Sequence, residues 1–506
     1  MSSERGERRT SVLGGIEAAP MFIGGVWRTR SSSFEVMNPA TGEVISRQAL
    51  ADEEDAKEAV EAAAGALDRW RKTPAFERAR ILERVSRLLV ERAEVIGEVL
   101  ALESGKLLGE AVGEVHFAAD YFRWFSGEAR RLQRFTCVEG RDGGPQMILR
   151  KPAGVAACLT PWNFPVSIQA RKIAPALAAG CTVVARPSEE APNSVVKLFG
   201  CLEEAGFPEG VANLLTGPAE EITRPMLEDP RVRVLSFTGS TSVGKKLYER
   251  SAATTKRLAL ELGGCAPFIV LEDADLGLAV EQAMVSKFRN CGQSCVAANV
   301  FYVHDRCYEE FISGLGERIN DLRLGDPLRE ETTLGPLINV ERRRAVEEIR
   351  DRALERGFAR VAAARMPSRQ DGIYPECFFP AELLVSRDYR DTDQHLLRTE
   401  IFGPLALVVG FSDLSELIGH LKQNPLGLAA YVFSHDETKA LRVASSLEVG
   451  IAGVNEGLAS AANVPMGGVK DSGIGREGGH EGLEEFLEYQ YIATRDLRFI
   501  GNPHPD

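Results

Sequence analysis

The sequence predicts an α/β protein that is built on mainly parallel β-sheets. Short apolar runs alternate with helical stretches of about ten to twenty residues between residues 147 and 433, which is typical of repeated βαβ units. The composition is that of a globular chain, because 44% of its 506 residues are hydrophobic and 26% are charged. At about 150 residues per domain this length predicts about three domains, and no low-complexity linker separates them.

The N-terminal part predicts a leader, a hairpin and three helices. Residues 1–20 are polar and lack the apolar segment of a secretory signal, so we expect a disordered leader. The next residues, Met21–Trp27, hold two short apolar runs around Gly24-Gly25, which predicts a β-hairpin. Helical periodicity then covers residues 53–72, 75–103 and 107–132.

Eight short apolar runs after residue 150 are predicted to be strands of the sheets, since each is bounded by helical or turn-forming sequence. They are Gly154–Leu159, Thr182–Ala185, Val211–Leu215, Val234–Thr238, Pro267–Leu271, Val300–Val303, Leu405–Phe411 and Ala429–Phe433.

Charge and cysteine content exclude several classes of protein. The formal net charge of −13 argues against a nucleic-acid partner, which requires a basic face. No apolar run approaches the roughly 18 residues of a membrane span. The nine cysteines form no CxxC pair and no Cys/His cluster, so we expect no disulfide framework and no metal site. This pattern fits a reducing, cytoplasmic setting.

Two glycine motifs resemble nucleotide-binding motifs, but each can also be a structural turn. Gly239–Lys246 approaches a phosphate-binding P-loop, but Lys246 stands where magnesium binding needs Ser or Thr, so an NTPase is rejected. Its strand–turn–helix context predicts either a pyrophosphate site at a helix N-terminus or a simple βα turn. Gly473–Gly478 matches GxGxxG without a preceding strand, which favours a structural turn.

Three polar residues stand beside predicted strand ends. Cys295 ends the segment Asn290–Cys295, Glu261 precedes paired glycines, and Asn163 lies between two prolines that fix a turn. Taken singly they are a buried cysteine, a strand end and a turn-capping amide. Taken together they supply a nucleophile, a base and an oxyanion donor at the carboxyl ends of strands, as acyl chemistry requires.

The chain resembles the aldehyde dehydrogenase superfamily from about Met21 to Arg495. The resemblance rests on several stretches that occur in the family's order and at the family's separations. They are Pro161–Pro165, Ala174–Gly180, Phe237–Ser240, Leu260–Gly264, Gly292–Cys295 and Glu400–Pro404.

The resemblance implies an NAD-dependent oxidation of an aldehyde to an acid through a cysteine thioester, with NADP also possible. It makes Cys295 the nucleophile, Glu261 the general base, Asn163 the oxyanion donor, and Lys172 a residue that orients the cofactor or the Glu261 network. The implied cofactor residues are Trp162, Arg186, Glu189, Gly239, Ser240, Glu400 and Phe402.

Within the superfamily the chain looks most like succinate-semialdehyde dehydrogenases, through Ile168–Lys172, Ser286–Asn290, Cys295–Asn299 and Gly473–Gly478. That branch implies a substrate-carboxylate site at Arg171, Arg289 and Ser460. Arginine suits this role because its planar fork grips a carboxylate with two hydrogen bonds. The alternatives are an enzyme for another ω-carboxylated aldehyde, such as glutarate semialdehyde, and a non-catalytic scaffold relative.

The family's fold implies two open, Rossmann-like parallel-sheet domains and a small β element for oligomerisation. We expect a leader at 1–20, and a homodimer or homotetramer. The expected parts are a cofactor domain at 21–134 and 154–262, a catalytic domain at 263–460, a bridging element at 135–153 and 480–498, and a return segment at 461–479.

Arg186 departs from the family, which usually has lysine there, and it complicates the choice of cofactor. Glu189 stands where the family accepts ribose hydroxyls, and a carboxylate repels the extra phosphate of NADP. Treated as a solvent-exposed charge, Arg186 offsets only part of that repulsion. We therefore expect NAD to be preferred and NADP to be tolerated.

Overall fold

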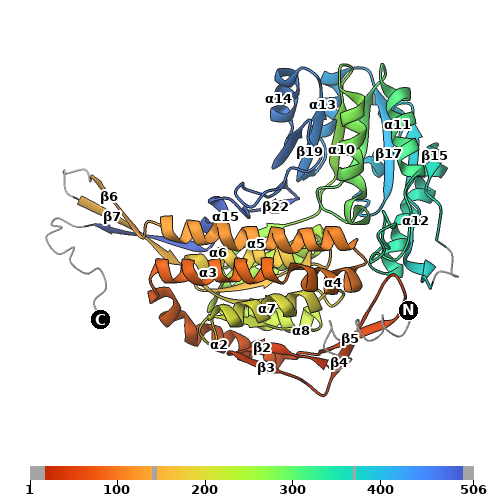
Figure 1. Ribbon diagram of the computed structural model, residues 1–506. Coiled ribbons are helices and arrows are strands. Elements are labelled where there is room, and N and C mark those ends of the chain that lie inside the picture. The colour runs from red at the N-terminus through yellow and green to blue at the C-terminus, as the bar shows by residue number, and fades with distance from the viewer. Residues whose placement is uncertain (1–17, 140–144, 368–371, 494–506) are drawn as a thin grey trace.

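The computed structural model describes residues 18–139, 145–367 and 372–493. Two lobes are each built around one large sheet, and a long ribbon of strands projects from the first lobe (Figure 1). The predicted α/β fold with mainly parallel sheets is confirmed.

The first lobe contains an eight-stranded sheet in the order β22-β12-β11-β8-β9-β10-β2-β3. Its five central strands run parallel, and the outer strands pair antiparallel. The parallel strands are β8 (Val155–Leu159), β9 (Thr182–Arg186), β10 (Ala212–Leu214), β11 (Val232–Thr238) and β12 (Arg257–Glu261). The outer strands are β2 (Met21–Ile23), β3 (Val26–Arg28) and β22 (Gly473–Ile474).

Helices cover both faces of this sheet. Alternate residues of β8 enter two separate cores, with Ala156 and Cys158 in one and Val155 and Ala157 in the other. This two-sided burial explains why the strand is apolar throughout. The helices of the lobe are α2 (Glu53–Lys72), α3 (Ala75–Glu91), α4 (Ala93–Ser104), α5 (Leu108–Arg131), α6 (Pro165–Ala179), α7 (Asn193–Ala205), α8 (Ala219–Glu228) and α9 (Thr241–Ser251).

The second lobe contains a seven-stranded sheet in the order β15-β16-β17-β14-β13-β19-β20, parallel except for β15. Phe268 and Phe433, on the adjacent strands β13 and β19, stack with ring centroids 4.4 Å apart. The strands are β13 (Ala266–Val270), β14 (Ala298–His304), β15 (Ala359–Ala363), β16 (Glu382–Ser386), β17 (Leu405–Phe411), β19 (Ala429–Phe433) and β20 (Ile451–Val454). The helices are α10 (Leu276–Phe288), α11 (Tyr308–Asn320), α12 (Val340–Glu355), α13 (Leu414–Lys422) and α14 (Glu437–Ser446).

The projecting ribbon is a three-stranded antiparallel sheet in the order β23-β7-β6. Its strands come from distant parts of the chain: β6 (Phe135–Glu139), β7 (Pro145–Pro152) and β23 (Leu487–Ala493), which follows α15 (Glu481–Glu484). Two smaller sheets join β1 (Ala18–Ala19), β5 (Val44–Ala49) and β4 (Ser33–Met37), and β18 (Leu426–Gly427) with β21 (Val469–Lys470).

The predicted hairpin, the three helical regions and the eight predicted strands are all present. Two boundaries differ. The helical region 75–103 is two helices that meet at Arg92, which has non-helical backbone angles. The expected leader extends too far, because Ala18 and Ala19 pair with Arg47 and Gln48 of β5 and this ladder orders them. Residues 1–17, 140–144, 368–371 and 494–498 of the expected segments lie outside the described residues.

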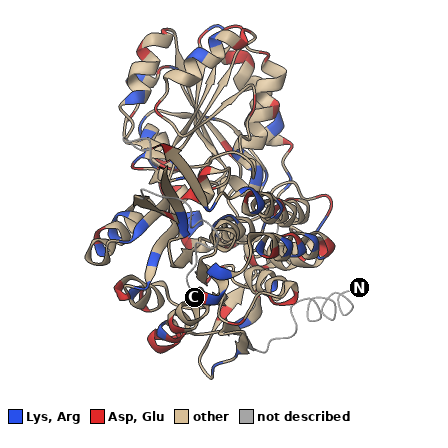
Figure 2. Ribbon diagram, turned by 90° about the vertical axis from the view of Figure 1, so that its left-hand side faces the viewer, with Lys and Arg blue, Asp and Glu red and all other residues tan. Residues whose placement is uncertain are grey.

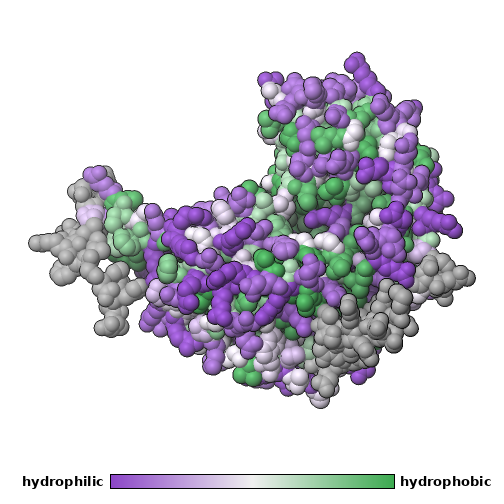
Figure 3. All heavy atoms as spheres, viewed as in Figure 1, coloured by the Kyte–Doolittle hydropathy of each residue, from purple (hydrophilic) through white to green (hydrophobic). Residues whose placement is uncertain are grey.

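Charges are confined largely to the outer helices. Figure 2 shows Lys and Arg interspersed with Asp and Glu on those helices, while the strands of the second lobe carry little charge. Among the described residues, no helix is both long and apolar enough to cross a membrane. Figure 3 shows hydrophobic atoms on the projecting ribbon, whose exposed side chains include Phe135, Val138, Tyr489, Tyr491 and Ile492.

Candidate active site

The carboxyl ends of neighbouring parallel strands place most of the candidate residues at one edge of the first sheet. Trp162 and Asn163 follow β8, and Glu261 is the last residue of β12. Arg186 ends β9, and Gly239 follows β11. Because these strands are adjacent and parallel, their ends converge where ligands bind in open α/β sheets.

A cavity of about 270 Å³ brings together residues from both lobes. Five candidate residues line it: Arg171, Glu261, Arg289, Cys295 and Ser460. They come from α6, β12, the end of α10 and two loops, so the fold gathers segments that are distant in the sequence. Asn163 and Lys172 are not among the lining residues, although both are buried close to this region.

The loop before Cys295 has a strained backbone. Asn290, Cys291 and Gly292 have φ angles of 51°, 55° and 71°, and two non-glycine residues in this left-handed region cost about 1 kcal/mol or more each. Gly292 is required, because a Cβ there would lie 2.3 Å from the Gly403 carbonyl oxygen. Strain retained beside a half-buried thiol indicates that this loop has a positioning role.

Hydrogen bonds hold this loop against Asn163. The Asn163 amide Nδ2 donates to the Gln293 carbonyl at 3.1 Å, and Asn290 Nδ2 donates to the Asn163 carbonyl at 2.9 Å. The buried Asn163 Oδ1 has no hydrogen-bond partner among the described residues. The side chain therefore has one anchoring bond, and the second hydrogen on Nδ2 is free to meet a ligand oxygen.

Glu261 is a buried carboxylate, and both of its oxygens lack a hydrogen-bond partner in the described part of the chain. Burial raises its pKa well above that of an ordinary glutamate, and the neighbouring Glu477 charge raises it further. Glycine at 467 leaves room for this side chain, since a Cβ there would lie 2.7 Å from Glu261 Oε1. An unpartnered carboxylate with a raised pKa is suited to accepting a proton.

Glu477, which sequence reasoning missed, contacts two of the candidate residues. Its carboxylate lies 2.5 Å from Lys172 Nζ and 3.7 Å from the Arg171 guanidinium. Lys172 also donates to Ser236 Oγ at 3.2 Å. Lys172 thus acts on the Glu261 network through Glu477. The available signal was the motif Gly473–Gly478, which contains Glu477, but its interpretation as a turn and as a family resemblance gave Glu477 no role of its own.

The surroundings of the Cys295 thiol favour its protonated form. Burial raises its pKa to about 12, and the Glu400 charge contributes. Arg171 opposes this rise. The thiol therefore needs a proton acceptor before it can attack, and Glu261 lines the same cavity. Cys291 does not line this cavity, and burial raises the pKa of its thiol as well.

The two candidate carboxylate-binding arginines lie in different surroundings. Arg171 is buried, lies over the Tyr121 ring with 5.2 Å from Cζ to the ring centroid, and donates to the Met466 sulfur. Arg289 lies over the Phe164 ring at 4.9 Å and is partly exposed. The Arg171 Nε has no hydrogen-bond partner among the residues described. Two guanidinium groups in one cavity can hold an anionic end of a substrate.

The candidate cofactor residues surround the same sheet edge. The rings of Trp162 and Phe402, from the two lobes, meet edge to face at 5.4 Å. Ser240 caps α9 by accepting a hydrogen bond from Val243 N at 3.4 Å. Glu400 accepts a hydrogen bond from Gly264 N at 3.2 Å, and burial raises its pKa to about 7.

The environment of Arg186 differs from the solvent-exposed one that was expected. Its guanidinium is buried, donates twice to the Gly217 carbonyl at 2.8 and 3.2 Å, and forms an ion pair with Glu189. The earlier treatment of Arg186 as a solvent-exposed charge is therefore wrong, because β9 carries it into the interior of the sheet. Glu189 remains about 41% exposed and can face a ribose.

These residues fit a dinucleotide. The start of α9 follows the parallel strand β11, and the first-turn amides of a helix in this position can hold a pyrophosphate. The buried Thr238 Oγ1, the Glu261 oxygens and Asn163 Oδ1 lack partners within the described residues, as expected where a polar ligand is received.

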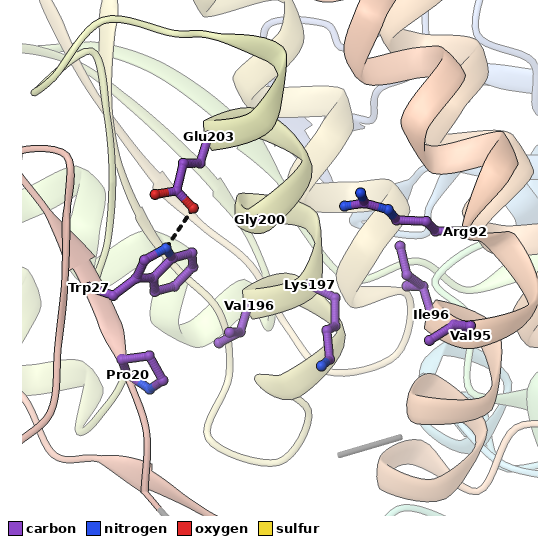
Figure 4. Close-up of a pocket in the computed structure, with 9 residues that line it drawn as sticks. All are labelled: Pro20, Trp27, Arg92, Val95, Ile96, Val196, Lys197, Gly200 and Glu203. Carbon is purple, nitrogen blue, oxygen red and sulfur yellow. Dashed lines mark hydrogen bonds between the residues drawn. The ribbon is translucent and has the colours of Figure 1, made fainter. Parts of the chain in front are cut away.

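A second cavity of about 380 Å³ lies in the first lobe, between β3, α4 and α7 (Figure 4). Trp27 Nε1 donates to Glu203 at 2.8 Å in its wall, and Lys197, Val95 and Ile96 also line it. It contains none of the candidate catalytic residues.

Glu261 lies at the carboxyl end of β12 as expected, but Cys295 lies before the amino end of β14, so its expected place at a carboxyl strand end is wrong. A thiol and a carboxylate that share one cavity between two α/β lobes mark the site of an enzyme. Comparison with known proteins identifies its family. Residues 27–492 match the aldehyde dehydrogenase family, and the chain belongs to that family. The protein is an NAD(P)-dependent aldehyde dehydrogenase, which confirms the expected class of enzyme.

Similar proteins cover nearly the whole chain. A glutarate-semialdehyde dehydrogenase of Pseudomonas aeruginosa is 40% identical over 478 residues, covering 93% of this chain and 96% of that protein. An NADP(+) succinate-semialdehyde dehydrogenase of Escherichia coli is also 40% identical over 478 residues, covering 93% of this chain and 97% of that protein. A 3-sulfolactaldehyde dehydrogenase of Pseudomonas putida is 42% identical over 474 residues, with coverage of 93% and 96%.

Solved structures support the same fold. A succinate-semialdehyde dehydrogenase from Burkholderia pseudomallei superposes with a TM-score of 0.90 at 39% identity, covering 96% of this chain and 99% of that one. A betaine aldehyde dehydrogenase from Staphylococcus aureus in complex with NAD+ superposes with a TM-score of 0.91 at 31% identity, with coverage of 97% and 98%.

Proposed function

We propose that this protein oxidises succinate semialdehyde to succinate. One observation carries the proposal: the cavity that holds Cys295 and Glu261 also holds two arginines and Ser460. An aldehyde with a distal carboxylate fits such a cavity, because guanidinium groups compensate for the loss of its hydration.

In the proposed mechanism, Glu261 accepts the proton of the Cys295 thiol, and the thiolate sulfur forms a bond to the aldehyde carbon. The Asn163 amide donates to the resulting oxyanion, a contribution of about 3 kcal/mol for a donor of this kind. Bound NAD(P) serves as the hydride acceptor. Glu261 passes the thiol proton to solvent and then takes a proton from water. The resulting hydroxide adds to the thioester carbon, the carbon–sulfur bond breaks, and the acid leaves with Cys295 as the thiolate.

Lys172 and Glu477 influence the pKa of the base Glu261. Lys172 holds Glu477 in place, and the negative charge of Glu477 helps to keep the Glu261 pKa high. A base with a raised pKa accepts a proton more readily at neutral pH.

The second candidate substrate is glutarate semialdehyde, which is longer by one methylene group. A relative that carries this name matches the chain as well as one named for succinate semialdehyde does. One methylene in an apolar pocket changes discrimination by only about 1–3 kcal/mol. A difference of that size leaves both aldehydes as substrates, and we propose succinate semialdehyde as the better one and glutarate semialdehyde as a slower one.

We propose NAD as the preferred cofactor and NADP as a tolerated one. The Arg186 guanidinium already has Gly217 and Glu189 as partners, so gripping a ribose phosphate would break an existing ion pair. Relatives named for NADP(+) and structures with NAD+ both occur in the family, so the cofactor ratio needs measurement.

We also propose a homodimer or homotetramer in the cytoplasm, acting on a small aldehyde. The exposed apolar side chains and free edges of the β23-β7-β6 sheet support assembly. The nine cysteines are free, and five of them are buried in the hydrophobic cores, which suits a reducing compartment.

The test compares kcat/KM on succinate semialdehyde, glutarate semialdehyde and butyraldehyde. We expect Arg171→Ala and Arg289→Ala each to raise the KM for succinate semialdehyde about ten- to a hundredfold, since each loses a charge-assisted pair worth about 1.5–3 kcal/mol. Butyraldehyde lacks the carboxylate and should be affected much less. Arg123→Ala, at an exposed arginine, is the control. Equal losses on all three aldehydes would contradict the carboxylate site.

A further inference from the structure

The main chain of Asn163 is held by a buried ion pair, one member of which, Glu114, lines the same cavity as Cys295 and Glu261. Lys106, in the loop between α4 and α5, forms an ion pair with Glu114 of α5, and their side chains are 0% and 2% exposed. The Lys106 ammonium also donates to the Asn163 carbonyl at 2.9 Å. It lies 4.0 Å from the centroid of the Phe164 ring.

Glu114 holds the residues that follow Asn163. Its Oε1 accepts hydrogen bonds from Val166 N at 3.0 Å and from Ser167 N at 3.1 Å, in the first turn of α6. Residue 164, where α6 is capped, makes no side-chain capping bond, so Glu114 supplies acceptors from another helix. Together Lys106 and Glu114 fix residues 163–167 as one unit.

Glu110, one turn before Glu114 on α5, holds the cysteine loop. Its carboxylate accepts from Asn290 N at 3.1 and 3.2 Å. Asn290 in turn donates to the same Asn163 carbonyl that accepts from Lys106. The α5 acids and Lys106 therefore set the separation between the Asn163 segment and the Cys295 loop.

We propose that Lys106 is a positioning residue, whose ammonium fixes the Asn163 main chain so that the Asn163 amide meets the oxyanion. This inference rests on the proposed role of Asn163. The side-chain amide has one anchoring bond of its own, to Gln293, so its direction depends on where the main chain is held. A displacement of about 1 Å in such a donor can lower the rate about a hundredfold.

The experiment is a double-mutant cycle on the full-length enzyme with saturating NAD and succinate semialdehyde. Lys106→Met alone would leave Glu114 as an unpaired buried carboxylate, so it is combined with Glu114→Gln, which keeps an acceptor oxygen for the α6 amides. The two substitutions, Lys106→Met and Glu114→Gln, are introduced together into the wild type and into the Asn163→Ala variant, and their effects on kcat are compared. Glu114→Gln alone is the second variant, in case the double variant does not fold.

We expect the double change to lower kcat about ten- to a hundredfold, with KM changed less than about threefold. In the Asn163→Ala background it should lower kcat less than about twofold further, since the donor it positions is already absent. Glu114→Gln alone should lower kcat by a smaller factor in the wild type. In the Asn163→Ala background it should also lower kcat less than it does in the wild type. The rate of Cys295 alkylation by iodoacetamide should stay within about twofold of wild type, because the nucleophile itself is unchanged.

The matched control is Lys256→Met. Lys256 is also buried and donates to two backbone carbonyls, those of Asp229 and Val232, both at 2.7 Å, away from the cavity. Equal losses of kcat with and without Asn163, or a tenfold fall in alkylation, would overturn the positioning role while leaving the proposed function intact. A wild-type kcat in Asn163→Ala would overturn the oxyanion role and the inference with it.

Discussion

At the scale of single residues, the chemistry depends on buried charges that influence one another. Glu261 has no hydrogen-bond partner in the described structure, and its pKa is raised first by burial and then by Glu477. Lys172 and Arg171 oppose this rise, but both are themselves close to Glu477. The pKa of the base is therefore set by a network rather than by one neighbour.

This network predicts the pH dependence of turnover. Because the folded pKa of Glu261 is raised, the carboxylate form is lost as pH falls through a value above that of ordinary glutamate, and kcat should fall with it. Glu477→Gln removes a charge that raises this pKa and frees two cations to lower it, so the acid limb should move to lower pH. The measurement is kcat between about pH 5 and pH 9 for both enzymes. An acid limb that stays in place would show that Glu477 does not act on the base.

The cofactor prediction also belongs to one side chain. Glu189→Ser removes the charge that would repel the ribose phosphate of NADP and leaves Arg186 without its ion-pair partner. We expect the ratio of kcat/KM for NAD over NADP to fall about fivefold, since a half-exposed charge interaction is worth about 1 kcal/mol. The wild-type ratio should exceed one. A wild-type preference for NADP would show that Arg186 governs this site despite its burial.

Sequence reasoning found the residues that stand in motifs and missed those that act through tertiary contacts. Cys295 and Glu261 could be predicted because distinctive neighbours surround them, and the cavity brings them together. Lys106 and Glu114 could not, because their partner is a main-chain segment about fifty residues away. One signal was present: Glu114 lies on the apolar face of α5, beside buried Val115 and Ala118. The exposure of Arg186 was predicted wrongly, because its position at the end of a predicted strand does not show whether its side chain is buried.

At the scale of elements, apolar runs bounded by turns were sufficient to place the parallel strands. The strands that the sequence did not reveal are mixed or lie at sheet edges, such as β12 with Arg257 and Glu261 at its ends, and the outer strands β15 and β20. Edge strands are buried on fewer sides and lose the continuous apolar run. The division of residues 75–103 into α3 and α4 was hidden because helical residues continue across Arg92.

One helix start gives an element-scale prediction of stability. Asp52 and Asp55 form a reciprocal capping box at the start of α2, with Asp52 accepting from Asp55 N at 3.0 Å. Asp52→Ala should lower the free energy of unfolding by about 1 kcal/mol and leave kcat unchanged. Thermal unfolding checks this, with Glu54→Ala, an exposed acid of the same turn that is outside the box, as the control. Identical melting temperatures for the two variants would contradict the capping role.

The Asp52 cap also predicts how this stabilisation depends on pH. The hydrogen bond from Asp55 N lowers the pKa of Asp52. A group with a lowered folded pKa stabilises the fold above its unfolded pKa, and that stabilisation is lost as pH falls through the folded value. The melting temperatures of wild type and Asp52→Ala should therefore converge in acid.

At the scale of the whole molecule, the ribbon of β6, β7 and β23 stands out because neither lobe covers it. It projects from the first lobe (Figure 1), and β6 is exposed along most of its length. Its strands are joined by ladders that link residues 135–152 to residues 487–493. A sheet that leaves two edges and several apolar side chains exposed is a surface on which another chain can add.

The ribbon therefore predicts that assembly depends on its apolar side chains. Tyr491 and Ile492 are 62% and 36% exposed on β23. Replacing both with aspartate should shift the protein toward the monomer, because burying two unpaired carboxylates at an interface costs several kcal/mol. Light scattering coupled to size-exclusion chromatography measures the mass of the assembly. Leu441→Asp, at a leucine of α14 that is 56% exposed, is the control and should leave the mass unchanged. If the ribbon variant and the control keep the same mass as wild type, assembly uses another face of the molecule.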